Sequence, residues 1–385
     1  MVQFKLLALP LLVAVGTVFA NVQSISDCPA LPPRKSPPKD VTDLRPDDIK
    51  VVAALGDSIM AGFAMMGVNY GAHGTGIVNF TSIMEFRGNS YGIGGDTDAV
   101  TLANFVKHYS PNVKGASRLA HIVSYCSAKE CTIPESFYRP LIDNLNGAQS
   151  GAIAMNLDYE LDYLIPRMKS YFKKDEDFKK AWKFITIQIG SNDQCDACSA
   201  SEKSKYVTPE LYGKYVNAAL QRIQKEIPRV VVNLQTPRHF IVGTFKVSNV
   251  LRLTAGHHDY CPPNGILENT KECACGTSEE GLKAMDATSE AYNKQLEKIA
   301  AKYPGKPGGS FAVMYSPAPI DILSFPIDAI SNIDCFHPSL KGHQWIAKNF
   351  WNQIFLSKDK KPKHMKFDDK LKIYCPTEND RFPTA

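Results

Sequence analysis

Two hydrophobic patterns alternate along this chain. Short apolar runs that are rich in β-branched and aromatic residues are typical of strands buried on both faces of a parallel sheet. Such runs occur at 51–55, 184–189, 229–234 and 311–315. Longer segments repeat apolar positions with a helical period, at 155–172, 209–227, 278–303 and 338–355. This alternation predicts an α/β protein, a three-layer α/β/α sandwich whose helices cover both faces of a central parallel sheet.

Proline positions refine these elements. Thr208 and Pro209 provide an N-cap and a first helical residue for the second helix, whereas Pro166 would kink or divide the first. Residues 21–48 contain CPALPPRKSPPKD, a proline density that predicts an extended lead-in. We therefore expect one domain over 49–356, followed by a basic C-terminal tail at 357–385.

The first twenty residues have a different pattern. MVQFKLLALPLLVAVGTVFA contains one lysine, an apolar stretch and a small-x-small end. It predicts a signal peptide over 1–20, cleaved after Ala20, and hence a secreted, extracellular protein. The alternative is an N-terminal membrane anchor, for which the apolar stretch is short.

The charge of the chain excludes some partners. The net charge is +5, or +4 once Lys5 leaves with the signal peptide, which is too weak to indicate nucleic-acid binding. Lysines are concentrated in 357–375. Two interpretations stand open for this segment: a solvated tail, or peripheral contact with an anionic lipid surface.

Ten cysteines, all beyond residue 20, fit an oxidising compartment. The pairs Cys126 with Cys131 and Cys195 with Cys198 are close enough in sequence to form local disulfides, although sequence alone does not determine connectivity. Asn79 stands in a glycosylation sequon, Asn-Phe-Thr, which suits a secreted glycoprotein.

The first candidate for chemistry is Ser58, in VVAALGDSIMAG. It directly follows the first predicted strand, and ligands of parallel sheets bind at the carboxyl ends of the strands. The G-x-S-x-G nucleophile elbow of α/β-hydrolases is absent. Gly-Asp-Ser alone is weak evidence, because it is also typical of a strand-to-helix turn, in which Asp57 would hydrogen-bond the backbone.

Three further segments add donors and a base. The first, 145–157 (LNGAQSGAIAMNL), is rich in small residues that allow close backbone approach to a ligand. Asn192 follows the second strand, where its amide could donate to an oxyanion or close an Asx-turn. Asp334 and His337 have the spacing at which a carboxylate orients an imidazole, although an exposed polar loop has the same composition.

In order, these segments present Ser, Gly, Asn and Asp-x-x-His, and so resemble the SGNH (GDSL) hydrolase superfamily. Further stretches resemble its phospholipase B branch. They are EFRGNSYGIGGDTDAVTLANFVKHYSP (85–111), NDQCDAC (192–198), PRVVVNLQ (228–235) and the C-x-C that precedes a long helix. The resemblance covers roughly residues 45–356.

The resemblance implies catalytic roles at the matching positions. Ser58 would be the nucleophile, His337 the general base and Asp334 the residue that orients His337. No residue of the catalytic pattern is missing.

The resemblance also implies an oxyanion hole. It would consist of the backbone N–H groups of Ser58 and Gly151 together with the side chain of Asn192. Gly151 is preferred to Gly147 because the family's glycine stands five positions after an Asn, here Asn146.

The function implied is that of a secreted, cofactor-independent carboxylic ester hydrolase. It would act on phospholipid or lysophospholipid substrates through an acyl-enzyme on Ser58, with no nucleic acid and no obligate protein partner. One alternative is an esterase for acetylated carbohydrate or other small esters, and a second is a non-catalytic lipid-binding module. A zinc site at His257 and His258 with the neighbouring cysteines is a further alternative, although disulfides are favoured in an oxidising compartment.

The stretch 62–80 (GFAMMGVNYGAHGTGIVNF) interleaves apolar side chains with glycines. It is either an acyl-chain cleft or lid beside Ser58, or ordinary core beneath a loop. The apolar side chains concerned are Phe63, Met65, Met66, Tyr70 and Phe80.

Overall fold

The computed structural model describes residues 21–67, 83–131, 138–199, 202–235, 246–261, 273–317 and 319–384. The predicted signal peptide, the Asn79 sequon, Tyr70 and Phe80 lie outside these residues, as does the side chain of Cys131. Within them, no helix combines the length and apolarity needed to cross a bilayer.

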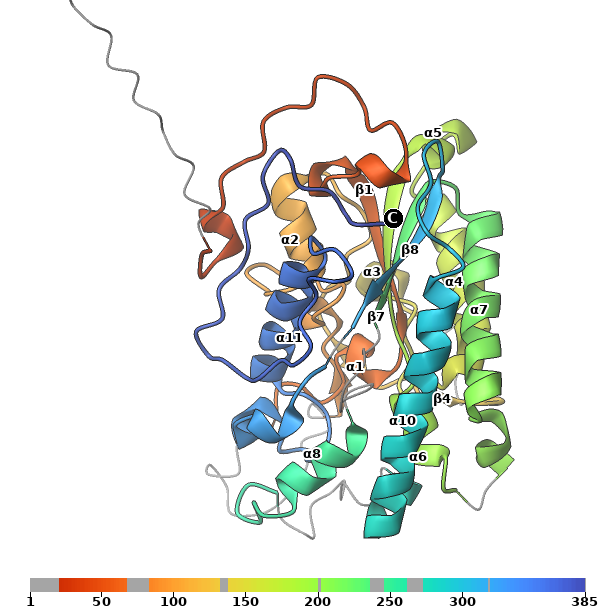
Figure 1. The fold of residues 1–385 in the computed structure, drawn as a ribbon, viewed down its shortest axis with the longest axis vertical. Coiled ribbons are helices and arrows are strands. Elements are labelled where there is room, and N and C mark those ends of the chain that lie inside the picture. The colour runs from red at the N-terminus through yellow and green to blue at the C-terminus, as the bar shows by residue number, and fades with distance from the viewer. Residues whose placement is uncertain are drawn as a thin grey trace, which may run out of the picture.

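Four parallel strands form the central sheet (Figure 1). They are β1 (Ile49–Gly56), β6 (Trp182–Gln188), β7 (Val230–Gln235) and β8 (Phe311–Ser316), in the spatial order β1-β6-β7-β8. The register places Ala54 opposite Thr186 and Thr186 opposite Asn233. Almost every residue of β1, β6 and β7 is buried, which explains why the strands appear in the sequence as continuous apolar runs.

Helices cover both faces of this sheet, which confirms the predicted sandwich (Figure 1). One face packs against α4 (Leu157–Lys169), α7 (Pro209–Glu226) and α10 (Glu279–Ala300). The opposite face packs against α2 (Leu102–Tyr109) and α11 (Leu340–Gln353).

Aromatic pairs join the helices within each layer. Tyr212 of α7 and Tyr292 of α10 stack with ring centroids 4.1 Å apart. On the other face, Phe105 of α2 packs edge-on against Trp351 of α11 at 5.4 Å. Such pairs bury large side chains in favourable ring geometries and therefore fix how neighbouring helices lie.

The helix ends follow the sequence signals in part. Thr208 caps α7 by accepting a hydrogen bond from the Leu211 N–H at 3.3 Å, and Pro209 is its first residue. Pro166 does not divide its helix, because α4 continues to Lys169. The proline lies in the last turn, where it removes only one intrahelical hydrogen bond.

Short elements complete the described fold. The helices are α1 (Ser58–Ala61), α3 (Pro140–Asp143), α5 (Asp175–Lys180), α6 (Ser191–Asp196) and α8 (Val247–Thr254). The strands are β2 (Met84–Glu85) paired with β3 (His121–Ile122), and β4 (Cys126–Ser127) paired with β5 (Glu130–Cys131). Single 3₁₀ turns lie at Arg87–Asn89, Ala154–Asn156, Glu202–Tyr206, Ala274–Thr277, Ile322–Ser324 and Ile327–Ala329.

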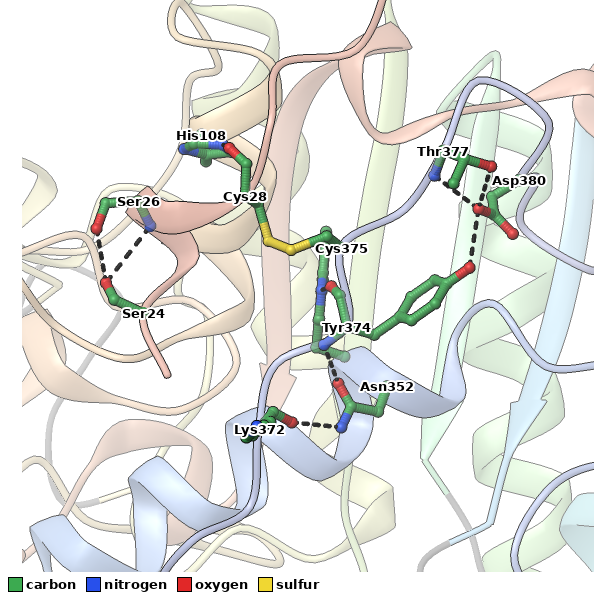
Figure 2. Close-up of a disulfide and its surroundings, with 11 residues drawn as sticks. Ser24, Ser26, Cys28, His108, Asn352, Lys372, Tyr374, Cys375, Thr377 and Asp380 are labelled. Atoms are coloured by element: carbon green, nitrogen blue, oxygen red, sulfur yellow. Dashed lines mark hydrogen bonds between the residues drawn. A yellow bond between two sulfur atoms is a disulfide. The ribbon is translucent and has the colours of Figure 1, made fainter. Parts of the chain in front are cut away.

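The two ends of the described chain are fastened together (Figure 2). A disulfide joins Cys28 to Cys375, and the backbone of Val22 pairs with that of Ile373. The lead-in is not wholly extended, because it forms 3₁₀ turns at Ile25–Asp27, Val41–Asp43 and Pro46–Asp48. The basic tail exposes most of its lysines, yet it is anchored by buried apolar side chains such as Phe382.

Candidate active site

Ser58 lies where β1 turns into α1. Gly56 ends the strand with a φ of 151°, and a Cβ at this position would lie 2.1 Å from the Gln188 carbonyl oxygen. Asp57 then caps α1 by accepting a hydrogen bond from the Ile59 N–H at 3.0 Å. The turn therefore requires a glycine and an N-cap residue before the serine, and it places Ser58 at the carboxyl end of β1.

His337 and Asp334 lie in the loop before α11. One carboxylate oxygen of Asp334 accepts the backbone N–H groups of Phe336 and His337, at 2.9 and 3.0 Å. Its other oxygen lies 2.6 Å from His337 Nδ1. The loop therefore folds around the aspartate, which orients the imidazole ring.

The histidine bridges the serine and the aspartate. His337 Nε2 lies 2.6 Å from Ser58 Oγ, although the two residues are 279 positions apart in sequence. Ser58, His337 and Asp334 are 5, 4 and 0% exposed. The structure thus brings the three residues together in the order hydroxyl, imidazole, carboxylate, an arrangement able to activate a serine.

The two candidate glycines differ in what their amides do. The Gly147 N–H donates to the Ala54 carbonyl at 2.9 Å, which extends the sheet beyond β1. Gly151 has a φ of 80°, and its N–H has no acceptor among the described residues, as is also true of Ser58. Both of these amides are thus available to an incoming oxygen, which the Gly147 amide is not.

Asn192 lies in the first turn of α6, after the end of β6. Its side-chain amide donates to the Ala152 carbonyl at 2.9 Å, one residue beyond Gly151. The amide nitrogen carries a second N–H that can reach a ligand. The contact couples Asn192 directly to the segment that carries Gly151.

Three buried carboxyl groups support these loops. Asp193 accepts the Ala154 N–H, and Glu160 of α4 accepts the Gly56 N–H at 2.9 Å. Burial raises the pKa of Asp57 and Glu160 above their ordinary values and that of Asp193 to about 8. The expected bracing by Asp57 is confirmed, whereas sequence reasoning missed Glu160. Its only signal is an acidic residue amid the apolar positions of the 155–172 pattern.

The predicted local disulfide between Cys195 and Cys198 is wrong. Cys195 is bonded to Cys273 and Cys198 to Cys275, with Cα–Cα distances of 4.3 and 5.0 Å. Cys195, in α6, and Cys198, two residues beyond the end of α6, are instead bonded to the C-x-C segment. The bonds therefore tie the Asn192 helix to the N-terminal end of α10.

The remaining cysteines concern the predicted Cys126–Cys131 bridge and the alternative of a zinc site. The backbone pairs Cys126 with Cys131 across β4 and β5, and Cys126 is disulfide-bonded. Cys261 is bonded to Cys335. The thiolates that a zinc site near His257 and His258 would need are therefore consumed in disulfides. Within the described ranges, no three His, Cys, Asp or Glu side chains cluster as metal ligands would.

The family model of GDSL-like lipases/acylhydrolases matches residues 52–350. "Phospholipase B1, membrane-associated" of Homo sapiens is 29% identical over 370 residues, and that of Rattus norvegicus is 27% identical over 367. Each alignment covers 92% of this chain but 23% of the relative. The chain thus spans about a quarter of the length of these relatives.

Solved structures that resemble the chain include a putative GDSL-like lipase from Parabacteroides merdae, with 16% identity and a TM-score of 0.35. The alignment covers 79% of this chain and 94% of the lipase. An acetyl xylan esterase from Geobacillus stearothermophilus has 14% identity and a TM-score of 0.33 over 79% and 95%. Because the family model spans most of the chain, including Ser58 and His337, this protein belongs to the GDSL-like lipase/acylhydrolase family.

Proposed function

We propose that the chain hydrolyses the carboxylic esters of phospholipids and lysophospholipids through an acyl-enzyme on Ser58. The observation that carries this proposal is the continuous contact from Ser58 Oγ through His337 to Asp334, with 2.6 Å at each step. The names of the relatives, which are phospholipases, support the choice of substrate.

The reaction would begin with proton transfer. His337 Nε2 takes the proton of Ser58 Oγ as that oxygen attacks the ester carbonyl carbon, and Asp334 stabilises the resulting imidazolium. The carbonyl oxygen becomes an oxyanion, which accepts hydrogen bonds from the Ser58 and Gly151 amides and from the Asn192 side chain. Preorganised donors of this kind stabilise the transition state more than the ground state.

Collapse of the tetrahedral intermediate gives the acyl-enzyme. His337 returns its proton to the leaving alkoxide, which departs as the alcohol of the lysolipid or of the glycerophosphodiester. Water then loses a proton to His337 and attacks the acyl carbon. The fatty acid leaves when Ser58 Oγ recovers the proton, so one histidine serves both half-reactions.

An apolar cluster beside the histidine supports a long-acyl substrate. The Phe63 ring meets the His337 ring edge-on, with centroids 5.0 Å apart. Ile83, Val123 and Ile333 pack with Phe63 in the same cluster. The acyl-cleft prediction needs one revision, because Met65 is 1% exposed and belongs to the core, whereas Met66 is 43% exposed.

The tryptophans count against a carbohydrate groove built on stacking rings. Trp182, Trp345 and Trp351 are all buried, at 5, 4 and 0% exposed. Because no tryptophan face is open to a sugar, we favour lipid over acetylated carbohydrate as the substrate class.

A substrate panel tests the proposed function. Free fatty acid or acetate release is measured from lysophospholipid, diacyl phospholipid, triglyceride and acetylated sugar, with Ser58→Ala as the inactive control. Highest kcat/KM on the two phospholipids is expected, because each buried CH₂ contributes up to about 0.8 kcal/mol. Equal or higher kcat/KM on acetylated sugar would overturn the lipid assignment.

Secretion is part of the same proposal. Its support is the signal-like segment at 1–20 together with the disulfides, which form in oxidising compartments. Expression in a secreting host should release a protein into the medium whose N-terminal residue is Asn21. Retention of the full-length chain in the membrane fraction would support the anchor interpretation instead.

A further inference from the structure

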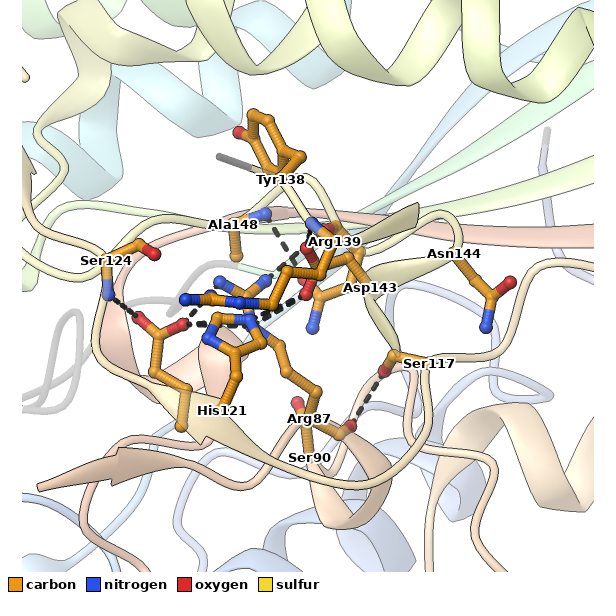
Figure 3. Close-up of polar contacts among 12 residues, drawn as sticks. Arg87, Ser90, Ser117, His121, Ser124, Tyr138, Arg139, Asp143, Asn144 and Ala148 are labelled. Atoms are coloured by element: carbon orange, nitrogen blue, oxygen red, sulfur yellow. Dashed lines mark hydrogen bonds and ion pairs between the residues drawn. The ribbon is translucent and has the colours of Figure 1, made fainter. Parts of the chain in front are cut away.

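A cluster of four buried ionisable side chains contacts residues 146–151, which we call the Gly151 segment; Figure 3 shows Arg87, His121 and Asp143 of this cluster. Glu85 and Arg87 flank the end of β2, His121 begins β3, and Asp143 ends α3. Their exposed fractions are 0, 0, 5 and 1%. Arg87 Nη2 lies 2.6 Å from Glu85 Oε2, and Arg87 Nε lies 3.5 Å from Asp143 Oδ1. The ester hydrolysis described above uses none of these groups.

The side chains of this cluster are hydrogen-bonded to one another and to the backbone. His121 Nδ1 donates to the Ile122 carbonyl at 2.7 Å, because a carbonyl oxygen can only accept. His121 Nε2 lies 2.8 Å from Asp143 Oδ1. Although burial acts to raise the pKa of Asp143, the Arg87 charge and the His121 hydrogen bond hold it below the ordinary value. Arg87 and His121 thus both contact the Asp143 carboxylate, and Arg87 also contacts the carboxylate of Glu85.

The cluster holds both ends of the segment that leads to Gly151. Arg87 Nη1 donates to the Asn146 carbonyl at 3.3 Å. At the other end, Ser150 Oγ donates to Glu85 Oε1 at 2.6 Å. Because Ser150 directly precedes Gly151, the Glu85 carboxylate holds the chain next to the Gly151 amide, on the side-chain side of a residue whose carbonyl also accepts the Cys126 N–H at 2.8 Å.

The same cluster is tied to the helix of the candidate nucleophile. The Phe86 N–H donates to the Gly62 carbonyl and the Ala64 N–H to the Met84 carbonyl, each at 2.9 Å, so the β2 backbone pairs with the chain that leaves α1. Glu85 thus contacts the Gly151 segment through its side chain, while its backbone pairs with the chain that leaves the Ser58 helix. It therefore links the position of one to the position of the other.

We propose that Glu85 is a positioning residue for ester hydrolysis, which holds the Gly151 amide at the oxyanion through Ser150. The inference rests on the proposed function, since it assumes that Gly151 is an oxyanion donor. A buried ion pair is weak evidence for stability, because desolvation opposes its Coulomb attraction. Fixing a donor relative to the nucleophile does matter, because small displacements of reacting groups cost rate.

The test uses two buried serines that differ in their acceptor. Ser150→Ala removes the link to Glu85 and leaves every charge in place. Ser117→Ala is the matched control, because Ser117 is also buried and donates at 2.7 Å to the Arg87 carbonyl, outside the Gly151 segment. Thermal unfolding is measured for both variants, and kcat and KM are expressed per active site titrated with an organophosphonate.

We expect Ser150→Ala to lower kcat on the order of 10-fold with KM nearly unchanged, less than the 10²–10³-fold cost of deleting an oxyanion donor. Ser117→Ala should keep kcat within about 2-fold of the unaltered protein, even if its melting temperature falls as much as that of Ser150→Ala. Equal kcat in the two variants, or a change in Ser150→Ala confined to KM or to unfolding, would overturn the inference.

A double-mutant cycle of Ser150→Ala with Asn192→Ala measures whether the two losses of kcat are coupled. A purely structural role of Ser150 would give no such coupling. If Ser150 acts through the oxyanion hole, the double variant should lose less kcat than the product of the two single losses. Strictly multiplicative losses would contradict the inference. Ser58→Ala separates the two proposals: activity in that variant overturns the proposed function itself. An inactive Ser58→Ala beside an unaffected Ser150→Ala overturns only the role of Glu85.

Discussion

Asp193 accepts the Ala154 N–H with both oxygens of its carboxyl group, each at 3.1 Å, and so joins the helix of Asn192 to the segment that follows Gly151. This carboxyl group is fully buried. Burial raises its pKa from the ordinary 3.8 to about 8. The protonation of Asp193 is thereby linked both to folding and to the geometry of the proposed oxyanion hole.

The first prediction concerns pH. Between pH 3.8 and about 8, the unfolded chain has an ionised Asp193 while the folded chain keeps the proton. The contribution of Asp193 to stability is therefore full at low pH and is lost as pH rises through about 8. Asp193→Asn, which resembles the protonated form, should remove this loss, which is on the order of 1 kcal/mol per pH unit. The free energy of unfolding is measured in urea from pH 5 to 9 for the unaltered protein and for Asp193→Asn. Parallel pH dependence of this free energy in the two proteins would contradict the raised pKa of Asp193.

The second prediction concerns the serine, histidine and aspartate. Ser58→Ala should abolish hydrolysis, and His337→Ala should be nearly as severe, because a serine without its base is a poor nucleophile. Asp334→Ala should be milder, since the carboxylate orients the ring and stabilises its charge. Circular dichroism checks that each variant folds. Mass spectrometry of the organophosphonate-labelled protein should locate the label on Ser58, and a label elsewhere would remove the nucleophile assignment.

The third prediction concerns Asn192. Asn192→Ala should lower kcat about 10²-fold with a smaller change in KM, because its second N–H acts on charge that develops in the transition state. The substitution also removes the hydrogen bond to Ala152, so unfolding is measured in parallel. An effect on KM alone would indicate that Asn192 holds substrate and does not stabilise the oxyanion.

The fourth prediction concerns the disulfides. Replacing Cys198 and Cys275 together by Ser should cost about 2–4 kcal/mol of stability and lower kcat, because this bond anchors the chain two residues after the helix of Asn192. The control is replacement of Cys28 and Cys375 by Ser, which opens a bond between the two ends of the described chain. That change should reduce stability without reducing kcat. Peptide mapping that recovered a Cys195–Cys198 bond would contradict both the Cys195–Cys273 and the Cys198–Cys275 disulfide.

The fifth prediction concerns chain length. Met66→Ser should reduce kcat/KM for long-acyl lysophospholipid more than for an acetyl ester, because Met66 is exposed apolar surface three residues beyond Phe63, which packs on His337. Its neighbour Met65 is core, so Met65→Ser should chiefly lower the melting temperature. Equal losses on both esters in Met66→Ser would place the acyl chain elsewhere.

The layers of the fold and the candidate catalytic residues were predictable from sequence because their signals are local. Buried parallel strands leave continuous apolar runs, and all four predicted strands lie within two residues of β1, β6, β7 and β8 at each end. Ser58, Asn192 and His337 each follow or precede a regular element, in an order that matches a known family. Short-range chemistry, such as the Asp57 cap or the Asp334 loop, is complete within three residues.

The rest was decided by contacts between segments far apart in sequence. Cys195 and Cys198 are close enough in sequence for a local bridge, yet the C-x-C segment, which lies against α6 in the fold, supplies their partners. Glu160 bonds the Gly56 amide across 104 residues, and Glu85 bonds Ser150 across 65. A buried carboxyl group cannot be recognised from the neighbouring sequence, because the donors and charges that stabilise it lie on other elements of the fold. Sequence by itself determined which residues could do the chemistry, whereas the tertiary structure decided which residues hold them in place.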